Sequence, residues 1–148
     1  MMLIEAMIGI LIFTIGILAL IGMQALAIRN TVDAKYRTEA SLLSNQIIAT
    51  MWTDVTNLAI YDTTSAIGCP VGGAASTPRE RAACRREAWI TQVSAALPGA
   101  VGPNAPAISV AGSTVTLTIY WVPKAEGVAG DGDPPKPHRY DVITDIRA

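Results

Sequence analysis

Few residues in this 148-residue sequence could take part in chemistry. It has two cysteines, Cys69 and Cys84, and one histidine, His138. Asp131 and Asp133 stand two positions apart in a stretch rich in Gly and Pro, which hints at calcium but is more typical of a plain turn. The sequence contains no Gly-rich phosphate loop, no HExxH and no paired Cys–His motif. We therefore expect no enzyme, no metal site and no other cofactor.

The two cysteines are separated by 14 residues in a stretch rich in Gly, Ala, Pro and Arg. Free thiols are the rule in a reducing compartment, whereas a disulfide is favoured in an exported domain next to a membrane anchor. Metal binding is poorly supported because the CxxC spacing is absent and the histidine is distant in sequence. We predict a Cys69–Cys84 disulfide that pins loop 68–83 to the next element and stabilises the fold by about 3 kcal/mol.

Glu5 is the one charge in an N-terminal apolar segment. From Ala6 to Ile28 there is no charge, and 18 of these 23 residues are Ala, Ile, Leu, Met or Phe. As a helix, this stretch would reach about 35 Å, enough to cross a bilayer core. The alternative, a cleaved secretory signal, would have basic residues in front and a small-residue cleavage site behind. We predict that residues 1–28 form a transmembrane anchor.

An acid at position 5 has two interpretations. It is favourable in the first turn of a helix, near the positive end of the dipole. In an apolar segment, however, an unpaired acid is costly and usually has a partner. The natural partner of Glu5 is the free amino group at Met1 of a neighbouring subunit, packed about one turn out of step. Basic residues follow the segment and none precedes it, which conflicts with an exported domain unless a basic leader once preceded Met1.

The charges that follow the apolar segment are balanced, as in an ordinary neutral domain. The chain has 11 Lys+Arg and 12 Asp+Glu, and residues 29–148 carry 11 charges of each sign. This balance argues against a strongly basic nucleic-acid binder. The absence of a second long apolar run excludes a multi-span transporter, and the 51% hydrophobic content disfavours disorder.

A long helix is predicted from the start of the chain. No Pro occurs before Pro70, and no Gly lies between Gly22 and Gly68. In that stretch, apolar residues recur at steps of three and four, as on one face of a helix: Val32, Tyr36, Ala40, Leu43, Ile47, Met51, Val55 and Leu58. We expect one helix from about Leu3 to Leu58, with an amphipathic half over residues 29–60. A parallel coiled coil is the competing explanation, and packing on a sheet of the same chain is the simpler one.

A second, shorter helix is predicted over residues 79–97, after a disulfide loop at 61–84. Thr77-Pro78-Arg79-Glu80 is typical of a helix start, and Pro98-Gly99 of a helix end. Four arginines and two glutamates give this region a local charge of +2: Arg79, Arg81, Arg85, Arg86, Glu80 and Glu87. We interpret them as a solvated face, with a contact for a partner subunit or for DNA phosphates as alternatives.

The C-terminal part has the alternation of β-strands. Ile108–Val110 and Thr114–Val122 predict a hairpin, and His138–Ile146 a last strand after an exposed loop at 124–137. The result is an antiparallel sheet of at least three strands within residues 106–146. The predicted fold class is α+β, with one long N-terminal helix packed on a small sheet in a globular head, residues 29–148.

Several segments resemble a known family. Leu3-Ile4-Glu5 followed by Ala6–Phe13 looks like the N-terminal signature of type IV pilins and their relatives. Ile15–Gln24, Ala34–Arg37 and Asn45–Ile48 resemble the minor pilins of the PilV type. The resemblance is good over residues 1–62 and holds only in outline beyond them.

The resemblance implies a type IV pilin-like fold and a processing history. A prepilin peptidase would cut a short leader after a glycine, and Met1, where Phe is usual, would be N-methylated. Glu5 would be the subunit-assembly residue. Gly9, Gly16 and Gly22 interrupt the apolar half; glycine is tolerated in membrane helices, and we favour a role in close helix packing.

The implied function is that of a minor pilin that joins other minor pilins in a complex priming pilus assembly, at the pilus tip. Its partners would be these minor pilins, the major pilin, the prepilin peptidase and inner-membrane lipid, with a tip adhesin as a further candidate and no nucleic acid. The head would lie in the periplasm before assembly and in the extracellular filament afterwards. The alternatives are a minor pseudopilin of a type II secretion system and a single-span anchored binding protein that never polymerises.

Overall fold

The computed structural model describes residues 2–122 and 136–147. The chain divides into an N-terminal unit, Met1–Lys35, and a C-terminal unit, Tyr36–Ala148. Helix α1, Met2–Trp52, supplies the first unit and continues into the second. The second unit adds helix α2, Pro78–Ala96, and three strands. A long apolar N-terminal helix and a small antiparallel sheet make the α+β layout that the sequence predicts.

Helix α1 ends six residues before the predicted Leu58. Its last turn tightens, because the Asp54 N–H donates to the Met51 carbonyl, and a 3₁₀ segment, η1 (Val55–Tyr61), follows. The Asp54 carboxylate accepts hydrogen bonds from Asn57 Nδ2 (2.6 Å) and Tyr61 OH (3.2 Å). A short polar side chain that binds nearby groups in this way competes with a continuing helix. No Gly or Pro marks this end, so the pattern of apolar residues alone predicted it too late.

Helix α2 begins with the predicted cap. The Thr77 hydroxyl accepts from the Glu80 N–H, and the Glu80 carboxylate accepts from the Thr77 N–H, which completes a capping box. Pro78 occupies the first turn, where its missing N–H is harmless. After α2, Gly99 has φ +74°, and an added Cβ there would lie 3.1 Å from the Val122 side chain. The chain therefore needs glycine where it leaves the helix.

The sheet has the order β1-β2-β3 and is antiparallel throughout. Its strands are β1 (Ala107–Ala111), β2 (Thr114–Trp121) and β3 (His138–Asp145), and a 3₁₀ turn, η3 (Gly102–Asn104), precedes them. Gly112 has φ +64° at the first position of the two-residue β1–β2 turn, the position that a type II′ turn reserves for glycine. The hairpin and the last strand predicted from alternation are both present.

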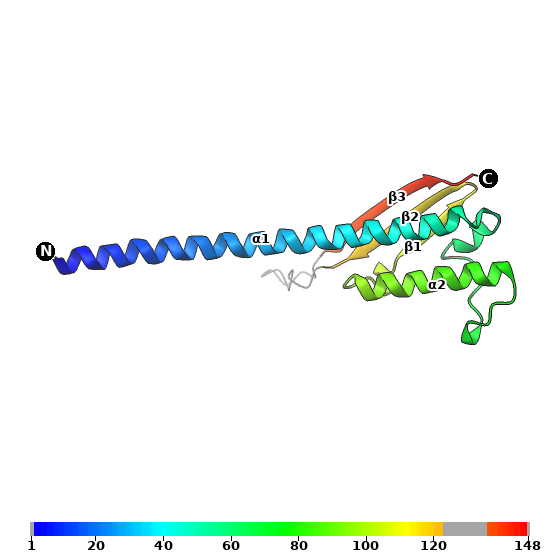
Figure 1. Cartoon of the computed structure of the whole chain (residues 1–148), viewed down its shortest axis with the longest axis horizontal. Helices are drawn as coiled ribbons and strands as arrows, with labels where there is room; N and C mark the ends of the chain where they lie inside the picture. The colour runs from blue at the N-terminus through cyan, green and yellow to red at the C-terminus, as the bar shows by residue number, and fades with distance from the viewer. Residues whose placement is uncertain (1, 123–135, 148) are drawn as a thin grey trace. The chain divides into compact units, whose positions relative to one another are not determined.

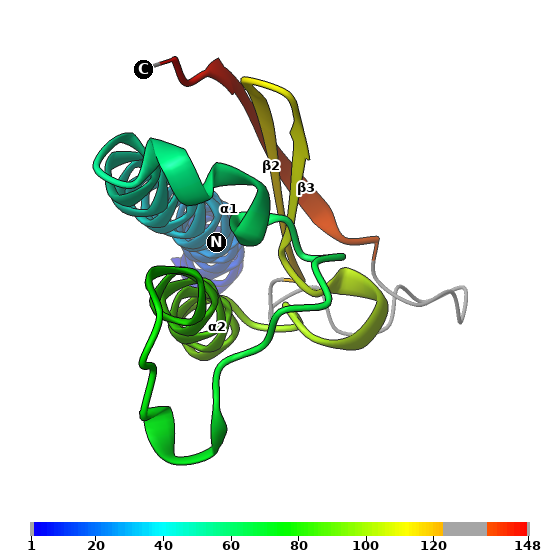
Figure 2. The ribbon, with the colours of Figure 1, turned by 90° about the vertical axis from the view of Figure 1, so that its right-hand side faces the viewer.

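Both helices cover one face of this sheet. Figure 1 shows α2 alongside the C-terminal part of α1, and Figure 2 shows the two helices on the same side of the strands. The core between the layers combines α1, α2 and alternate sheet residues, among them Ala40, Leu43, Ile47, Met51, Trp89, Val93, Ile108, Val115, Leu117, Ile119 and Trp121. Packing on a sheet of the same chain, rather than a coiled coil, thus accounts for the apolar stripe over residues 36–58.

Candidate functional site

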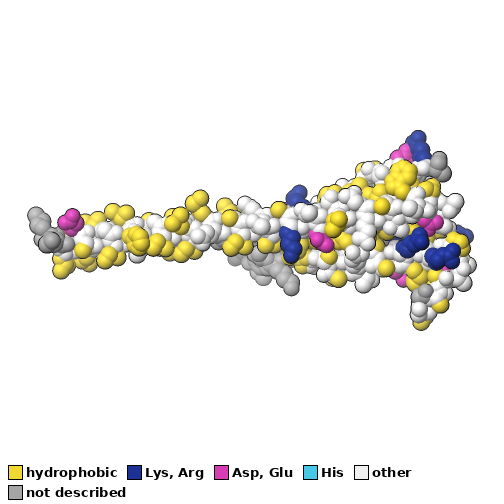
Figure 3. Space-filling model, in the orientation of Figure 1, with side chains coloured by type: hydrophobic (Ala, Val, Ile, Leu, Met, Phe, Trp, Pro, Cys, Tyr) yellow, Lys and Arg dark blue, Asp and Glu magenta, His cyan; other side chains and the backbone are white. Residues whose placement is uncertain are grey.

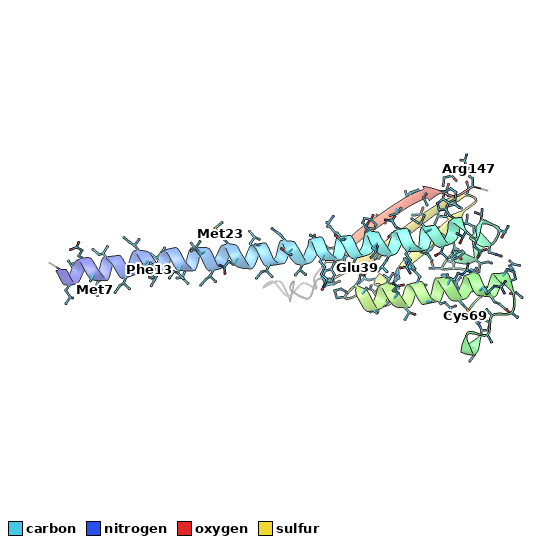
Figure 4. The ribbon with its side chains drawn as sticks, viewed as in Figure 1. Met7, Phe13, Met23, Glu39, Cys69 and Arg147 are labelled. Carbon is cyan, nitrogen blue, oxygen red and sulfur yellow. A yellow bond between two sulfur atoms is a disulfide. The ribbon has the colours of Figure 1, made fainter. Side chains whose placement is uncertain are left out.

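The apolar segment, residues 3–28, is exposed along its described length. It belongs to helix α1, and none of the most apolar stretch of this helix is buried. Figure 3 shows hydrophobic side chains along the face in view, and Figure 4 shows Met7, Phe13 and Met23 pointing outward from the helix. By length and composition, this helix is suited to crossing a membrane, although an N-terminal signal sequence would pass the same test.

Glu5 lies in the first turn of α1, where its charge complements the helix dipole. It is exposed and is the only charged residue between Leu3 and Ile28. Met1, the predicted processing and pairing residue, lies outside the described residues. The pairing of Glu5 with a neighbour's amino group therefore stays a prediction.

The three glycines of the apolar segment leave open space beside the helix. An added Cβ at Gly9, Gly16 or Gly22 would meet no other atom within 4 Å. Gly9 and Gly16 are seven residues apart, about two turns, and so share one face, whereas Gly22 lies off that face. No described atom near these positions requires a glycine, and their role in packing between helices stays a prediction.

The predicted disulfide is present between Cys69 and Cys84, and the Cα atoms lie 4.5 Å apart. Cys84 belongs to α2, and Cys69 to the loop before it (Figure 4). The Cys69 N–H also donates to the Glu87 carboxylate, at 2.9 Å. The cross-link thus ties the loop to the helix, as the sequence indicated.

The prediction of a solvated arginine face is wrong for Arg86. Its side chain is only 5% exposed and donates to the carbonyls of Ile60 (2.7 Å), Asp62 (2.9 Å) and Ile67 (2.9 Å). A guanidinium carries five N–H donors, so it can satisfy several carbonyls of an irregular loop at once. The helical spacing to buried Ala82, Ala83 and Trp89 was the signal that could have placed it inward.

Arg85, the preceding residue, does face solvent. It forms an ion pair with Asp54 at 3.5 Å across the seam between α2 and the end of α1. Hydrogen bonding to Tyr61, with a contribution from Asp54, raises the pKa of Arg85, and burial raises the pKa of Tyr61. This cluster of Asp54, Tyr61 and Arg85 joins elements of the C-terminal unit and offers no nucleophile with a base.

His138 begins β3 and lies against Trp121, with 5.6 Å between the ring centroids. Its neighbour Arg139 forms an ion pair with Asp141 and lies over the Tyr120 ring. Among the described residues, no group of three His, Cys, Asp or Glu side chains could hold a metal ion. Asp131 and Asp133, which hinted at calcium, lie outside the described residues, as does most of the loop expected at 124–137.

The structure thus defines a two-layer α+β protein with a long apolar N-terminal helix. Comparison of the chain with known protein families, with curated proteins and with solved structures gave no match in any of the three.

Proposed function

We propose that this chain is a minor pilin, similar to the PilV type, which primes the assembly of a type IV pilus and lies at the pilus tip. Before assembly, α1 would anchor it in the inner membrane with the C-terminal unit in the periplasm. Its partners would be other minor pilins, the major pilin and the prepilin peptidase, with a tip adhesin as a further candidate.

The observation that carries the proposal is an exposed apolar segment with a single acid in its first turn. No described residue covers the most apolar stretch of α1. Lipid can cover it in the membrane, and the apolar helices of other subunits can cover it in a filament. Removal from lipid must be offset by burial among other helices, and an ion pair between Glu5 and a neighbour's amino group would set their stagger.

The outward face of α1 in the C-terminal unit supports the same assembly. Leu43 on the inner face is 1% exposed, while Leu42 is 62% and Trp52 is 48% exposed. No charged residue occurs between Ala40 and Thr53, although part of this stretch faces solvent. Depletion of charge and exposed aromatic residues are features of protein interfaces. A neighbouring apolar helix is a fitting partner for this face.

Substitution of Glu5 tests the proposal. Glu5→Ala should remain in the membrane at the wild-type level but disappear from pili sheared off the cells. Glu39→Ala, which removes another acid of the same helix, is the matched control and should enter pili normally. Unchanged recovery of Glu5→Ala in sheared pili would rule out the pairing. If deletion of the chain abolishes type II secretion and leaves pili intact, the chain is a minor pseudopilin instead.

A further inference from the structure

The two edge strands of the sheet differ in charge. Strand β1 contains no charged residue, whereas β3 carries Arg139, Asp141 and Asp145. Charged side chains discourage an edge strand from pairing with another chain, and an uncharged edge is a template for such pairing. Strand β1 therefore needs protection of another kind.

Asp62 and Thr63 supply that protection. Alternate residues of an edge strand direct their backbone groups away from the sheet, and in β1 these are Ile108 and Val110. The Thr63 N–H donates to the Ile108 carbonyl at 2.9 Å, and Thr63 Oγ1 accepts from the Ile108 N–H at 3.4 Å. The Asp62 carboxylate accepts from the Val110 N–H at 2.9 Å. Residues of the same chain thus occupy three outward polar groups of β1.

Arg86 binds both ends and the middle of segment 60–67, which contains Asp62 and Thr63. Its guanidinium binds the carbonyls of Ile60, Asp62 and Ile67, so these contacts span the two residues that bind β1. Hydrogen bonds from a charged donor are stronger than neutral ones, and buried carbonyls that lose their donor are costly. The disulfide, by contrast, attaches the loop only at Cys69, beyond this segment.

We propose that Arg86 is a latch that holds segment 60–67 against β1, so that Asp62 and Thr63 guard this edge from strand addition by another copy of the chain. Because these contacts lie wholly within residues 60–110, the guard does not depend on the proposed role in pili. Loss of the latch exposes β1, and loss of the disulfide alone leaves the guard in place.

Hydrogen exchange of the full chain in detergent micelles tests the latch. In the wild type, the amides of Ile108 and Val110 should be protected. Arg86→Met should speed their exchange by about tenfold or more, while amides between β2 and β3 stay protected. The matched control Arg85→Met should leave exchange at Ile108 and Val110 unchanged. The Cys69→Ser/Cys84→Ser double variant, which destabilises the whole unit, should not speed exchange at these two amides more than at those between β2 and β3. Asp62→Ala, which removes the acceptor of the Val110 N–H, should speed exchange at Val110 even if Arg86→Met fails to fold.

Self-association of the variants tests whether Asp62 and Thr63 prevent strand addition at β1. Arg86→Met or Asp62→Ala should form oligomers with an intermolecular β-sheet band in the infrared spectrum. Adding Ser109→Lys, a charge on β1, should suppress the oligomers but leave exchange at Val110 fast. Unchanged exchange at Val110 in both Arg86→Met and Asp62→Ala would overturn the latch. Oligomers that persist with Ser109→Lys would overturn the role of β1 as the exposed edge.

Discussion

Two parts of helix α1 differ in how far their apolar side chains are buried. In residues 36–52, one stripe of side chains is buried against the sheet and α2, and Leu43 and Met51 are almost fully covered. In residues 3–28, apolar side chains point in every direction, and those of Leu18 and Phe13, for example, are each 68% exposed. The first part is covered by other elements of the C-terminal unit, whereas no described residue covers the second.

The comparison shows that helix formation and helix burial are separate consequences of a sequence. Both parts lack Pro, and a continuous helix satisfies the backbone in water and in lipid alike. A stripe with a period of three to four residues leads to packing on one side. An apolar surface on all sides suits a surrounding of lipid or helices.

Truncation of single leucines tests this comparison and should give the largest change in the free energy of unfolding. Leu43→Ala should lower the free energy of unfolding of the C-terminal unit by about 2–5 kcal/mol, because it removes buried methyl groups and leaves a cavity. Leu42→Ala, the adjacent exposed position, and Leu18→Ala in the apolar segment should change it by less than about 0.5 kcal/mol. Urea unfolding of the full chain in detergent micelles, followed by tryptophan fluorescence, measures all three. Equal losses at Leu42 and Leu43 would contradict the distinction between the faces.

Removal of the disulfide should have the next largest effect and act on one region only. Cys69→Ser/Cys84→Ser should destabilise the C-terminal unit by about 3 kcal/mol, because the unfolded chain gains the freedom of a loop. Partition of the full chain into lipid vesicles should stay unchanged, since the apolar segment contains no cysteine. The same urea titration, with a flotation assay, checks both; a loss of vesicle binding would show that the two regions are coupled.

The helix cap should give the smallest effect. Thr77→Ala should lower the free energy of unfolding in the same urea titration by about 1 kcal/mol, since the Glu80 N–H loses its acceptor. Hydrogen bonds from the Thr77 and Ser76 N–H groups and the Ser76 hydroxyl lower the pKa of Glu80 from 4.5 to about 2.

A carboxylate whose pKa is lower in the folded than in the unfolded state stabilises the fold. This stabilisation is complete at a pH above the pKa of the unfolded state, and it disappears as the pH falls through the folded-state pKa of about 2. In thermal unfolding, the wild type should therefore have a higher melting temperature than Glu80→Gln at pH 6, and this difference should vanish near pH 2. An advantage that persists at pH 2 would contradict the cap's dependence on the charged carboxylate.

Much of the fold was predictable because its signals are local. The stripe through Leu43 and Ile47, the Thr77–Glu80 capping box and the alternation in β2 each specify one element within a few residues. The disulfide followed from combining two cysteines with an apolar anchor. These features need no knowledge of distant contacts.

The other features depend on contacts between residues far apart in sequence. Arg86 looked like part of a solvated face, yet it binds carbonyls 19 to 26 residues earlier in the chain. The end of α1 at Trp52 is an exception: it depends on contacts of Asp54 with Asn57 and Tyr61, only three and seven residues later, and no Gly or Pro marks it in the sequence. Such partners are fixed only once the chain has folded. The assembly role of Glu5 belongs to contacts between chains and stays a prediction.

The central claim is that the apolar segment is the processed N-terminus of a filament subunit. The most direct measurement is mass spectrometry of the N-terminal peptide of the protein purified from the cells that make it. We predict a peptide that starts at Met1 and carries one methyl group on its amino nitrogen. A peptide that begins with an uncleaved leader, or with an unmodified Met1, would contradict the claim and favour a membrane anchor that never polymerises.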